Sequence, residues 1–313
     1  MKLSNRIIKC AALSVLSLTC SHTANAQEGY QRYYNQVPAQ QDTSYSRYSA
    51  ARQKQAVRST QQTPSNAISL KTETGFEVGL QMSDYYYQEN EIASEKFMDQ
   101  SGLKFGLTLG LNAAMSYGFF MSGDLRFAYS DNDYWSAPTG DVEGFGEDIL
   151  GEARFLVGKD FISENKLIVP FAFGLSPYVG IGYRNLHNDS SDTVVAGLHG
   201  YRRTSEYIYA PIGLTARFRV TDTSRLSLTA EYDGLLQGNQ KSCLSDVNPA
   251  LPDVDNEQES GRGARGSLMY ETKSWSVGPF VEYWNVNQSV ETAGWYEPHN
   301  YTLEYGAQVR VRF

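Results

Sequence analysis

The sequence predicts an all-β protein, an antiparallel transmembrane β-barrel of about ten strands. The first reason is that apolar and polar residues alternate along about ten segments from Thr74 onward, which is the period of a strand with two unlike faces. The second is that short and long connections alternate between these segments. The third is that no stretch after residue 26 holds eighteen consecutive apolar residues, so a helical span is not expected.

The first 26 residues are predicted to be a signal peptide. A basic start is followed by the apolar run 11–18 and then by Ala24, Asn25 and Ala26, an A-x-A cleavage pattern. The apolar run is too short to span a bilayer. We therefore expect cleavage before Gln27 and export of the chain.

Residues 27–69 are predicted to form a disordered periplasmic segment ahead of the barrel, which we place at 70–313. This segment is rich in Gln, Ser and Tyr and has few aliphatic residues, so it can bury too little apolar surface to offset the entropy of ordering. A plug for the barrel lumen and a tail that contacts peptidoglycan remain alternative interpretations.

Charge and cysteine content exclude some function classes. The net charge is −8, and loss of the leader with its three basic residues would leave −11. Nucleic acid is thus not expected as a partner, because phosphate binding needs clustered Lys and Arg. Cys243 is the single cysteine after the leader, so no internal disulfide is expected.

The predicted strands are long enough to cross a bilayer when tilted. Pro170 and Pro177 fall inside the fifth strand and predict bulges or bends there. In the seventh strand, Gln237 is expected on the inner face. The ten ranges are 74–83, 103–112, 121–129, 148–161, 167–186, 207–218, 226–237, 262–271, 274–286 and 301–313.

The connections predict which end of the barrel faces the cell exterior. Short turns are expected at 116–118, 162–166, 221–225 and 272–273, and long loops at 88–101, 132–147, 187–204, 238–261 and 287–300. This asymmetry predicts short periplasmic turns, long extracellular loops and both termini in the periplasm. Aromatic residues near both strand ends predict two interfacial bands, and the long-loop band would include Tyr207, Tyr209 and Trp284.

The last strand carries the most specific signal. Tyr305, Val309, Val311 and the terminal Phe313 share one face, opposite Arg310 and Arg312. This stretch resembles the C-terminal signal of bacterial outer-membrane β-barrels. The resemblance implies a small Gram-negative outer-membrane barrel of porin-like, omptin-like or opacity-adhesin-like architecture. It also implies contact with outer-membrane lipid and lipopolysaccharide, and recognition of Tyr305, Val309, Val311 and Phe313 by the barrel-assembly machinery.

The inward parity carries seven acidic and nine basic residues, and two interpretations stay open. They could form an internal ion-pair network or a charged constriction of a pore. We expect Glu231 and Asp233 to pair with Arg217 and Arg219 across one turn. The candidate lumen residues are Glu77, Lys104, Asp124, Arg126, Glu152, Arg154, Arg184, Arg217, Arg219, Glu231, Asp233, Arg265, Glu282, Glu304, Arg310 and Arg312.

No catalytic or metal-binding pattern is predicted, and no cofactor. The acids Asp131 and Asp133 and the pair His187 and Asp189 would lie on near strands, so they do not match the facing pairs of omptin proteases. None of the later histidines begins the His-x-Ser pair of lipid A deacylases. We therefore expect a structural or binding, adhesin-like surface protein with an unidentified extracellular ligand. The alternative is a narrow porin-like diffusion channel, because glycines on the inner face would leave space: Gly79, Gly106, Gly110, Gly174, Gly180, Gly182, Gly213 and Gly278.

Overall fold

The chain folds into a closed antiparallel barrel of ten strands, which confirms the predicted fold class. The computed structural model describes residues 67–90, 96–136, 139–163, 172–195 and 197–313. The predicted signal peptide, most of the predicted 27–69 segment and Pro170 lie outside these residues. The sheet closes because β1 pairs with β2 on one side and with β14, the last strand, on the other. Among the described residues, no helix is long and apolar enough to cross a membrane.

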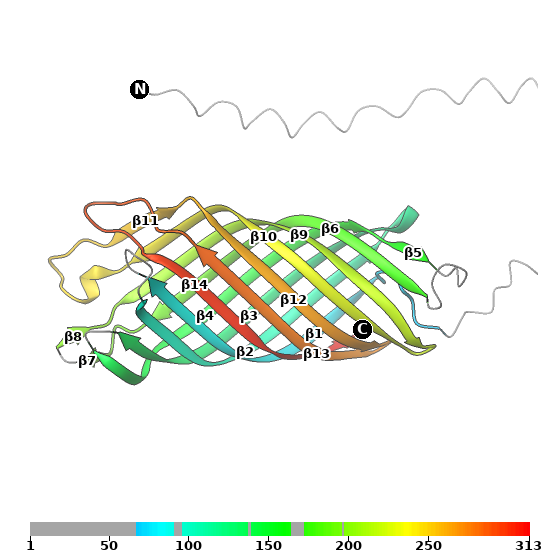
Figure 1. Ribbon diagram of the computed structural model, residues 1–313, viewed down its shortest axis with the longest axis horizontal. Helices are drawn as coiled ribbons and strands as arrows, with labels where there is room; N and C mark the ends of the chain where they lie inside the picture. Colours follow the sequence, from blue (N-terminus) through cyan, green and yellow to red (C-terminus); the bar gives the residue numbers. More distant parts are fainter. Residues whose placement is uncertain (1–66, 91–95, 137–138, 164–171, 196) are drawn as a thin grey trace, which may run out of the picture. The chain divides into compact units, whose positions relative to one another are not determined.

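The barrel strands follow one another around the ring in chain order (Figure 1). They are β1 (Gly75–Asn90), β2 (Lys96–Ala114), β3 (Phe119–Ser136), β4 (Gly140–Lys159), β6 (Phe173–Asp189), β9 (Arg202–Thr221), β10 (Ser224–Ser242), β12 (Gly261–Thr272), β13 (Trp275–Val286) and β14 (His299–Arg312). Short accessory elements lie in the connections: β5 (Phe161–Ser163), β7 (Val194–Val195), β8 (Leu198–His199), β11 (Val254–Gln258) and the 3₁₀ turns η2 (Ser116–Gly118) and η3 (Leu244–Asp246).

The two ends of the barrel differ. One end, here called the terminal end, holds Gly75, the last strand residue Arg312 and the tight turns such as that of η2. The opposite end, here called the loop end, holds β7, β8 and β11 and lies on the left of Figure 1. Connections 190–201, 243–260 and 287–298 make the loop end the larger one.

The two faces of the sheet have opposite chemistry. Large apolar side chains point outward and are exposed, for example Leu80 and Leu111 at 62% each. Polar and charged side chains alternate with them and are buried inside, as with Asp233 at 0%. A polar interior within an apolar outer band is typical of transmembrane barrels.

Several strands extend further toward the loop end than the sequence predicted. Residues 88–101 and 132–147 were predicted to be loops, yet β1 pairs with β2 as far as Asn90, and β3 pairs with β4 as far as Ser136. Their outward residues there are polar, such as Asp131 and Asp133. Pairing with the neighbouring strands gives the backbone N–H and C=O groups their hydrogen bonds, whether lipid or water covers the outer face. A strand therefore does not end where its outward residues become polar.

The predicted bulge at Pro177 is wrong. Pro177 lies opposite Leu214 in a β6–β9 register that stays continuous on both sides of it. The bulge that matters is in β10, between Leu235 and Gln237. It inverts the alternation, because a bulge adds one residue to one strand. Gln237 consequently faces outward, which corrects the predicted inner position, and Leu235 packs into the lumen.

The described N-terminal residues fill part of the terminal end. Ile68 and Leu70 are 0% and 3% exposed, and the Ile68 amide donates to the Asp222 carbonyl at 2.6 Å. Arg225 binds the Ser69 carbonyl, and the Thr72 amide donates to Asp160 at 2.8 Å. The packed chain thus already includes residues 67–69, which the sequence had assigned to the preceding segment.

Candidate functional site

The middle of the lumen is crossed by a network of ion pairs centred on Arg265 of β12. Its guanidinium lies 2.5 Å from Glu152, 2.7 Å from Asp233 and 3.3 Å from Glu231. It also lies 3.5 Å from Glu282. These carboxylates come from β4, β10 and β13, so one side chain joins walls that are far apart in the sequence.

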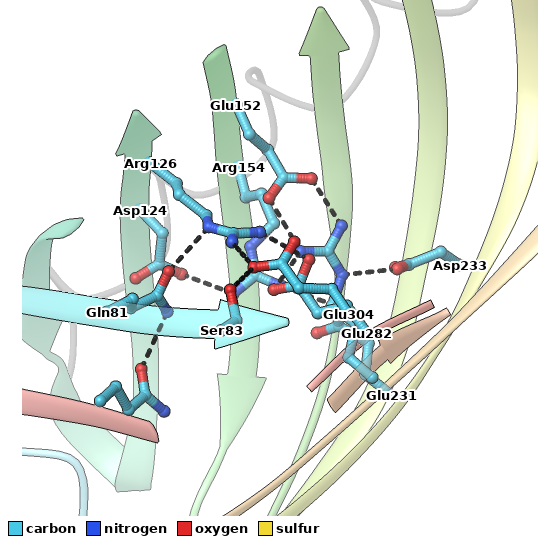
Figure 2. A network of polar contacts seen from close by, with 12 residues as sticks. Gln81, Ser83, Asp124, Arg126, Glu152, Arg154, Glu231, Asp233, Glu282 and Glu304 are labelled. Carbon is cyan, nitrogen blue, oxygen red and sulfur yellow. Dashed lines mark hydrogen bonds and ion pairs between the residues drawn. The ribbon is translucent and has the colours of Figure 1, made fainter. Parts of the chain in front are cut away.

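Arg126 of β3 makes the second crossing, toward β13, β14 and β1. It donates to Glu282 at 2.8 Å and to Gln81 at 2.7 Å, and it also binds Glu304. Glu304 in turn accepts from Ser83 at 2.6 Å. Figure 2 shows these side chains converging inside the barrel. Buried charges of this kind are stable only when paired and hydrogen-bonded, and here they are.

Arg154 of β4 completes the network. It lies 2.6 Å from Glu231 and 3.1 Å from Asp124 (Figure 2). The second oxygen of Glu231 accepts from the Tyr178 hydroxyl at 2.7 Å. A cavity of about 50 Å³ lies among the network residues. It has room for a few waters, since a cavity of about 10–15 Å³ already holds one.

A second group of ion pairs lies nearer the terminal end. Arg312 binds Glu77 at 2.5 Å, and Arg225 binds Glu271 at 2.6 Å. Arg310 is 3.7 Å from Glu77, and Arg217 is 3.5 Å from Asp160.

The predicted pairing of Glu231 and Asp233 with Arg217 and Arg219 is wrong. In the β9–β10 ladder, Arg217 lies opposite Ser227 and Arg219 opposite Arg225. Glu231 and Asp233 lie opposite Gly213 and Pro211, further toward the loop end. The prediction assumed that the two arginines and the two acids lie at the same distance from the β9–β10 turn. The register shows that the acids lie several positions further from that turn.

Three of the sixteen candidate lumen residues make other contacts. Lys104 is 1% exposed, and its ammonium lies 3.2 Å from the centroid of the Tyr85 ring. Arg184 lies 5.8 Å from the Trp284 ring, and Arg219 donates to the Ile68 carbonyl at 3.3 Å. The contacts of Lys104 and Arg184 with aromatic rings are cation–π contacts, which stabilise a desolvated cation.

Charged residues of the lumen that sequence reasoning missed include Asp148, Asp160, Arg225 and Glu271. Arg225 and Glu271 share the inward parity of Glu231 and Arg265 on their own strands, so the alternation alone could have found them. Asp148 and Asp160 share the inward parity of Glu152 and Arg154 within the predicted strand 148–161, so the same signal was present there.

At two of the eight glycines that were expected to leave open space, Gly182 and Gly213, aromatic side chains occupy it. A Cβ on Gly182 would lie 2.2 Å from the Tyr209 ring, and one on Gly213 would lie 2.3 Å from the Tyr178 ring. Tyr209 and Trp284 are 0% and 2% exposed and meet edge to face. Tyr207, Tyr209 and Trp284 were predicted in the outer aromatic band; they point into the lumen instead, and these glycines make room for rings, not for a pore.

A cavity of about 260 Å³ opens a separate site at the loop end. In its wall, the rings of Tyr134 and Phe145 stack at a centroid distance of 4.1 Å. Glu89 and Arg203 also line the cavity and form an ion pair at 2.5 Å. Its other apolar lining residues are Phe97, Met98, Val195, Leu198 and Tyr201. We call this the loop-end pocket.

Glu297 lies beside the Glu89–Arg203 pair, in the connection between β13 and β14. The Tyr87 hydroxyl lies 2.8 Å from Glu89 and 3.2 Å from Glu297. Burial first, and then the nearby charge of Glu89, raise the pKa of Glu297 to about 8, against the opposite effect of Arg203. This raised pKa favours the protonated form of Glu297 near neutral pH.

The acidic residue Asp131 and the pair His187 and Asp189, which do not match the facing pairs of omptin proteases, lie on nearby strands of the outer face. Asp131 is opposite Glu147, and Glu147 is opposite Asp189 on β6, two residues from His187. Within the described residues, no group of His, Cys, Asp and Glu could hold a metal ion.

The last strand presents its apolar face outward. Tyr305, Val309, Val311 and Phe313 are 52%, 43%, 45% and 75% exposed. The Phe313 backbone also joins Phe76 through two hydrogen bonds of 2.8 and 3.2 Å, so the C-terminal residue takes part in closing the barrel.

Several solved structures are similar to this chain at low sequence identity and low TM-score. The outer membrane protease OmpT from Escherichia coli is 11% identical, with a TM-score of 0.44 over 79% of this chain and 99% of that chain. Ail, the attachment invasion locus protein of Yersinia pestis, is 8% identical, with a TM-score of 0.28 over 77% and 99%.

The outer membrane channel COG4313 from Pseudomonas putida F1 is 10% identical, with a TM-score of 0.34 over 80% of this chain and 98% of that chain. No family model and no curated protein matches the sequence. The function of this chain therefore has to be argued from the site.

Proposed function

We propose that this protein is a non-conducting barrel of the Gram-negative outer membrane that serves as a structural and binding protein at the cell surface. The observation that carries the proposal is the filled lumen. Arg265, Arg126 and Arg154 join opposing walls, the inward rings of Tyr209 and Trp284 lie beside them, and the cavity among them is about 50 Å³. A diffusion channel needs a continuous water-filled path.

Location and orientation follow from the same physical pattern. The apolar outer band fits lipid, and the signal peptide supplies export. We place the terminal end in the periplasm and the loop end outside, in contact with lipopolysaccharide. Phe313 and its outward neighbours are then available to the assembly machinery. No catalytic role is proposed.

The loop-end pocket is the proposed place of binding. It is lined mainly by apolar and aromatic side chains, and its volume of about 260 Å³ exceeds the roughly 150 Å³ of an engineered cavity that accepts benzene. Apolar walls with a few polar groups are typical of ligand sites. An apolar group of an extracellular ligand would fit it.

The pocket is tested with an apolar fluorescent probe, N-phenyl-1-naphthylamine, on the refolded protein in detergent-free nanodiscs. Leu198→Asp places a charge in the lining and should abolish saturable fluorescence enhancement. Val290→Asp, an exposed loop-end change outside the pocket, should leave it intact. Equal enhancement in all three proteins, or none in the wild type, would remove the pocket from the proposal.

A further inference from the structure

The barrel holds a second and larger polar cavity between the ion-pair network and the N-terminal residues that fill the terminal end. Its volume is about 200 Å³. Arg217, Arg225, Arg310 and Arg312 line it, and they come from β9, β10 and β14. We call this cavity the terminal chamber.

Two of these four arginines are well neutralised. Arg225 binds Glu271 through Nε and Nη2 at 2.9 and 2.6 Å. Arg312 binds Glu77 through Nε at 2.7 Å and Nη2 at 2.5 Å. The carboxylates of Glu271 and Glu77 are thus already engaged by Arg225 and Arg312.

The other two are opposed more weakly. Arg310 lies 3.7 Å from Glu77, and its Nε and Nη2 donate to the neutral amide of Gln308 at 3.2 and 2.9 Å. Arg217 lies 3.5 Å from Asp160, which the Thr72 amide and the Ser176 hydroxyl already occupy. Two further acids line the cavity: Asp124, which Arg154 binds at 3.1 Å, and Glu73, which is exposed.

Buried donors without an acceptor lie around the same chamber. Arg217 Nε and Arg312 Nη1 are buried and have no hydrogen-bond partner among the described residues. A buried N–H of a charged group that lacks an acceptor is costly. Ser227 is directly opposite Arg217 in the β9–β10 ladder.

We propose that the terminal chamber binds a small oxyanion of phosphate size. Such an anion would accept hydrogen bonds from Arg217 and Arg312 at once and would offset the weakly opposed charge of Arg217 and Arg310. Charge-assisted bonds of arginine to phosphate are among the strong ones. The volume of the chamber, about 200 Å³, is well above the roughly 10–15 Å³ that one bound water needs, so a larger ion has room. This binding is independent of the loop-end pocket.

The test compares protein refolded in sodium phosphate, sodium sulfate or sodium chloride of equal ionic strength. Phosphate and sulfate should raise the thermal unfolding midpoint by about 2–4 °C relative to chloride. Arg217→Gln and Arg312→Gln should lose this rise. Arg202→Gln, which changes an arginine paired with Asp246 at the loop end, should keep it.

A second variant supplies the anion covalently, in case the arginine variants fail to fold. Ser227→Asp puts a carboxylate opposite Arg217 and should raise the midpoint in chloride while removing the effect of phosphate. Ser227→Asn should do neither. If phosphate and chloride give the same midpoint and Ser227→Asp lowers it, the chamber holds water alone and the proposal fails.

Discussion

Glu231 lies directly opposite Arg265 in the β10–β12 ladder, 3.3 Å from its guanidinium, whereas Arg217 lies opposite Ser227. The pairs in the middle of the lumen therefore join β10 to β4 and β12 and not to the neighbouring strand β9. This arrangement ties several strands together at one place, and it determines which substitutions should be coupled.

Glu231→Gln should lower the free energy of unfolding on the order of 3 kcal/mol, because it leaves the buried Arg154 without its 2.6 Å partner. Arg154→Gln combined with it should cost less than the sum of the two single changes, by about 0.5–3 kcal/mol. Arg217→Gln combined with Glu231→Gln should be additive within about 0.5 kcal/mol. Denaturant unfolding in detergent micelles measures the wild type and the five variants, and strong coupling to Arg217 would contradict the observed register.

Gly213→Ala should destabilise the barrel by about 1–3 kcal/mol, because the added methyl meets the Tyr178 ring at 2.3 Å. Gly151→Ala is the matched control, since a Cβ there meets nothing within 4 Å. Thermal unfolding monitored by gel mobility of heated and unheated samples compares them. Equal midpoints for the two variants would mean that the ring does not occupy that position.

Phe313→Ala should reduce the amount of barrel inserted into the membrane while export continues. The substitution keeps both backbone hydrogen bonds to Phe76, so purified and refolded protein should unfold within about 0.5 kcal/mol of the wild type. Quantifying membrane-inserted and periplasmic protein at native expression separates recognition from stability. Normal insertion of the variant would argue against an assembly signal at this residue.

Stability should fall as the pH rises from about 4.5 to about 8 and then level off, through Glu297. In this window the folded protein keeps a proton that the unfolded chain, with a pKa near 4.5, has lost. The slope from this group is at most about 1.4 kcal/mol per pH unit. Glu297→Gln should flatten it in unfolding midpoints measured from pH 5 to pH 9. The same slope in wild type and variant would place the titration elsewhere.

The alternation of the sequence predicted which residues face the lumen, because lipid and lumen impose opposite chemistry on successive positions. It could not predict which charges meet. Arg265 reaches Glu152 through the register of a closed, tilted sheet, and no local pattern encodes that register.

Other differences have equally specific causes. The bulge at Leu235–Gln237 inverts the alternation. Gly234 and Gly238 flank it, but glycine also occurs on the inner face without a bulge, as at Gly182, so it does not specify one. An inward glycine such as Gly182 can mark open space or a neighbouring ring, and only the position of Tyr209 distinguishes the two.

The most direct test of a closed lumen is the conductance of refolded wild-type protein in planar lipid bilayers. The filled network predicts a baseline equal to that of protein-free bilayers, even though gel mobility shows folded barrel in the same preparation. Stable conductance steps of one size at each insertion, with a reversal potential that shifts in Glu231→Gln, would contradict it and identify the barrel as a channel.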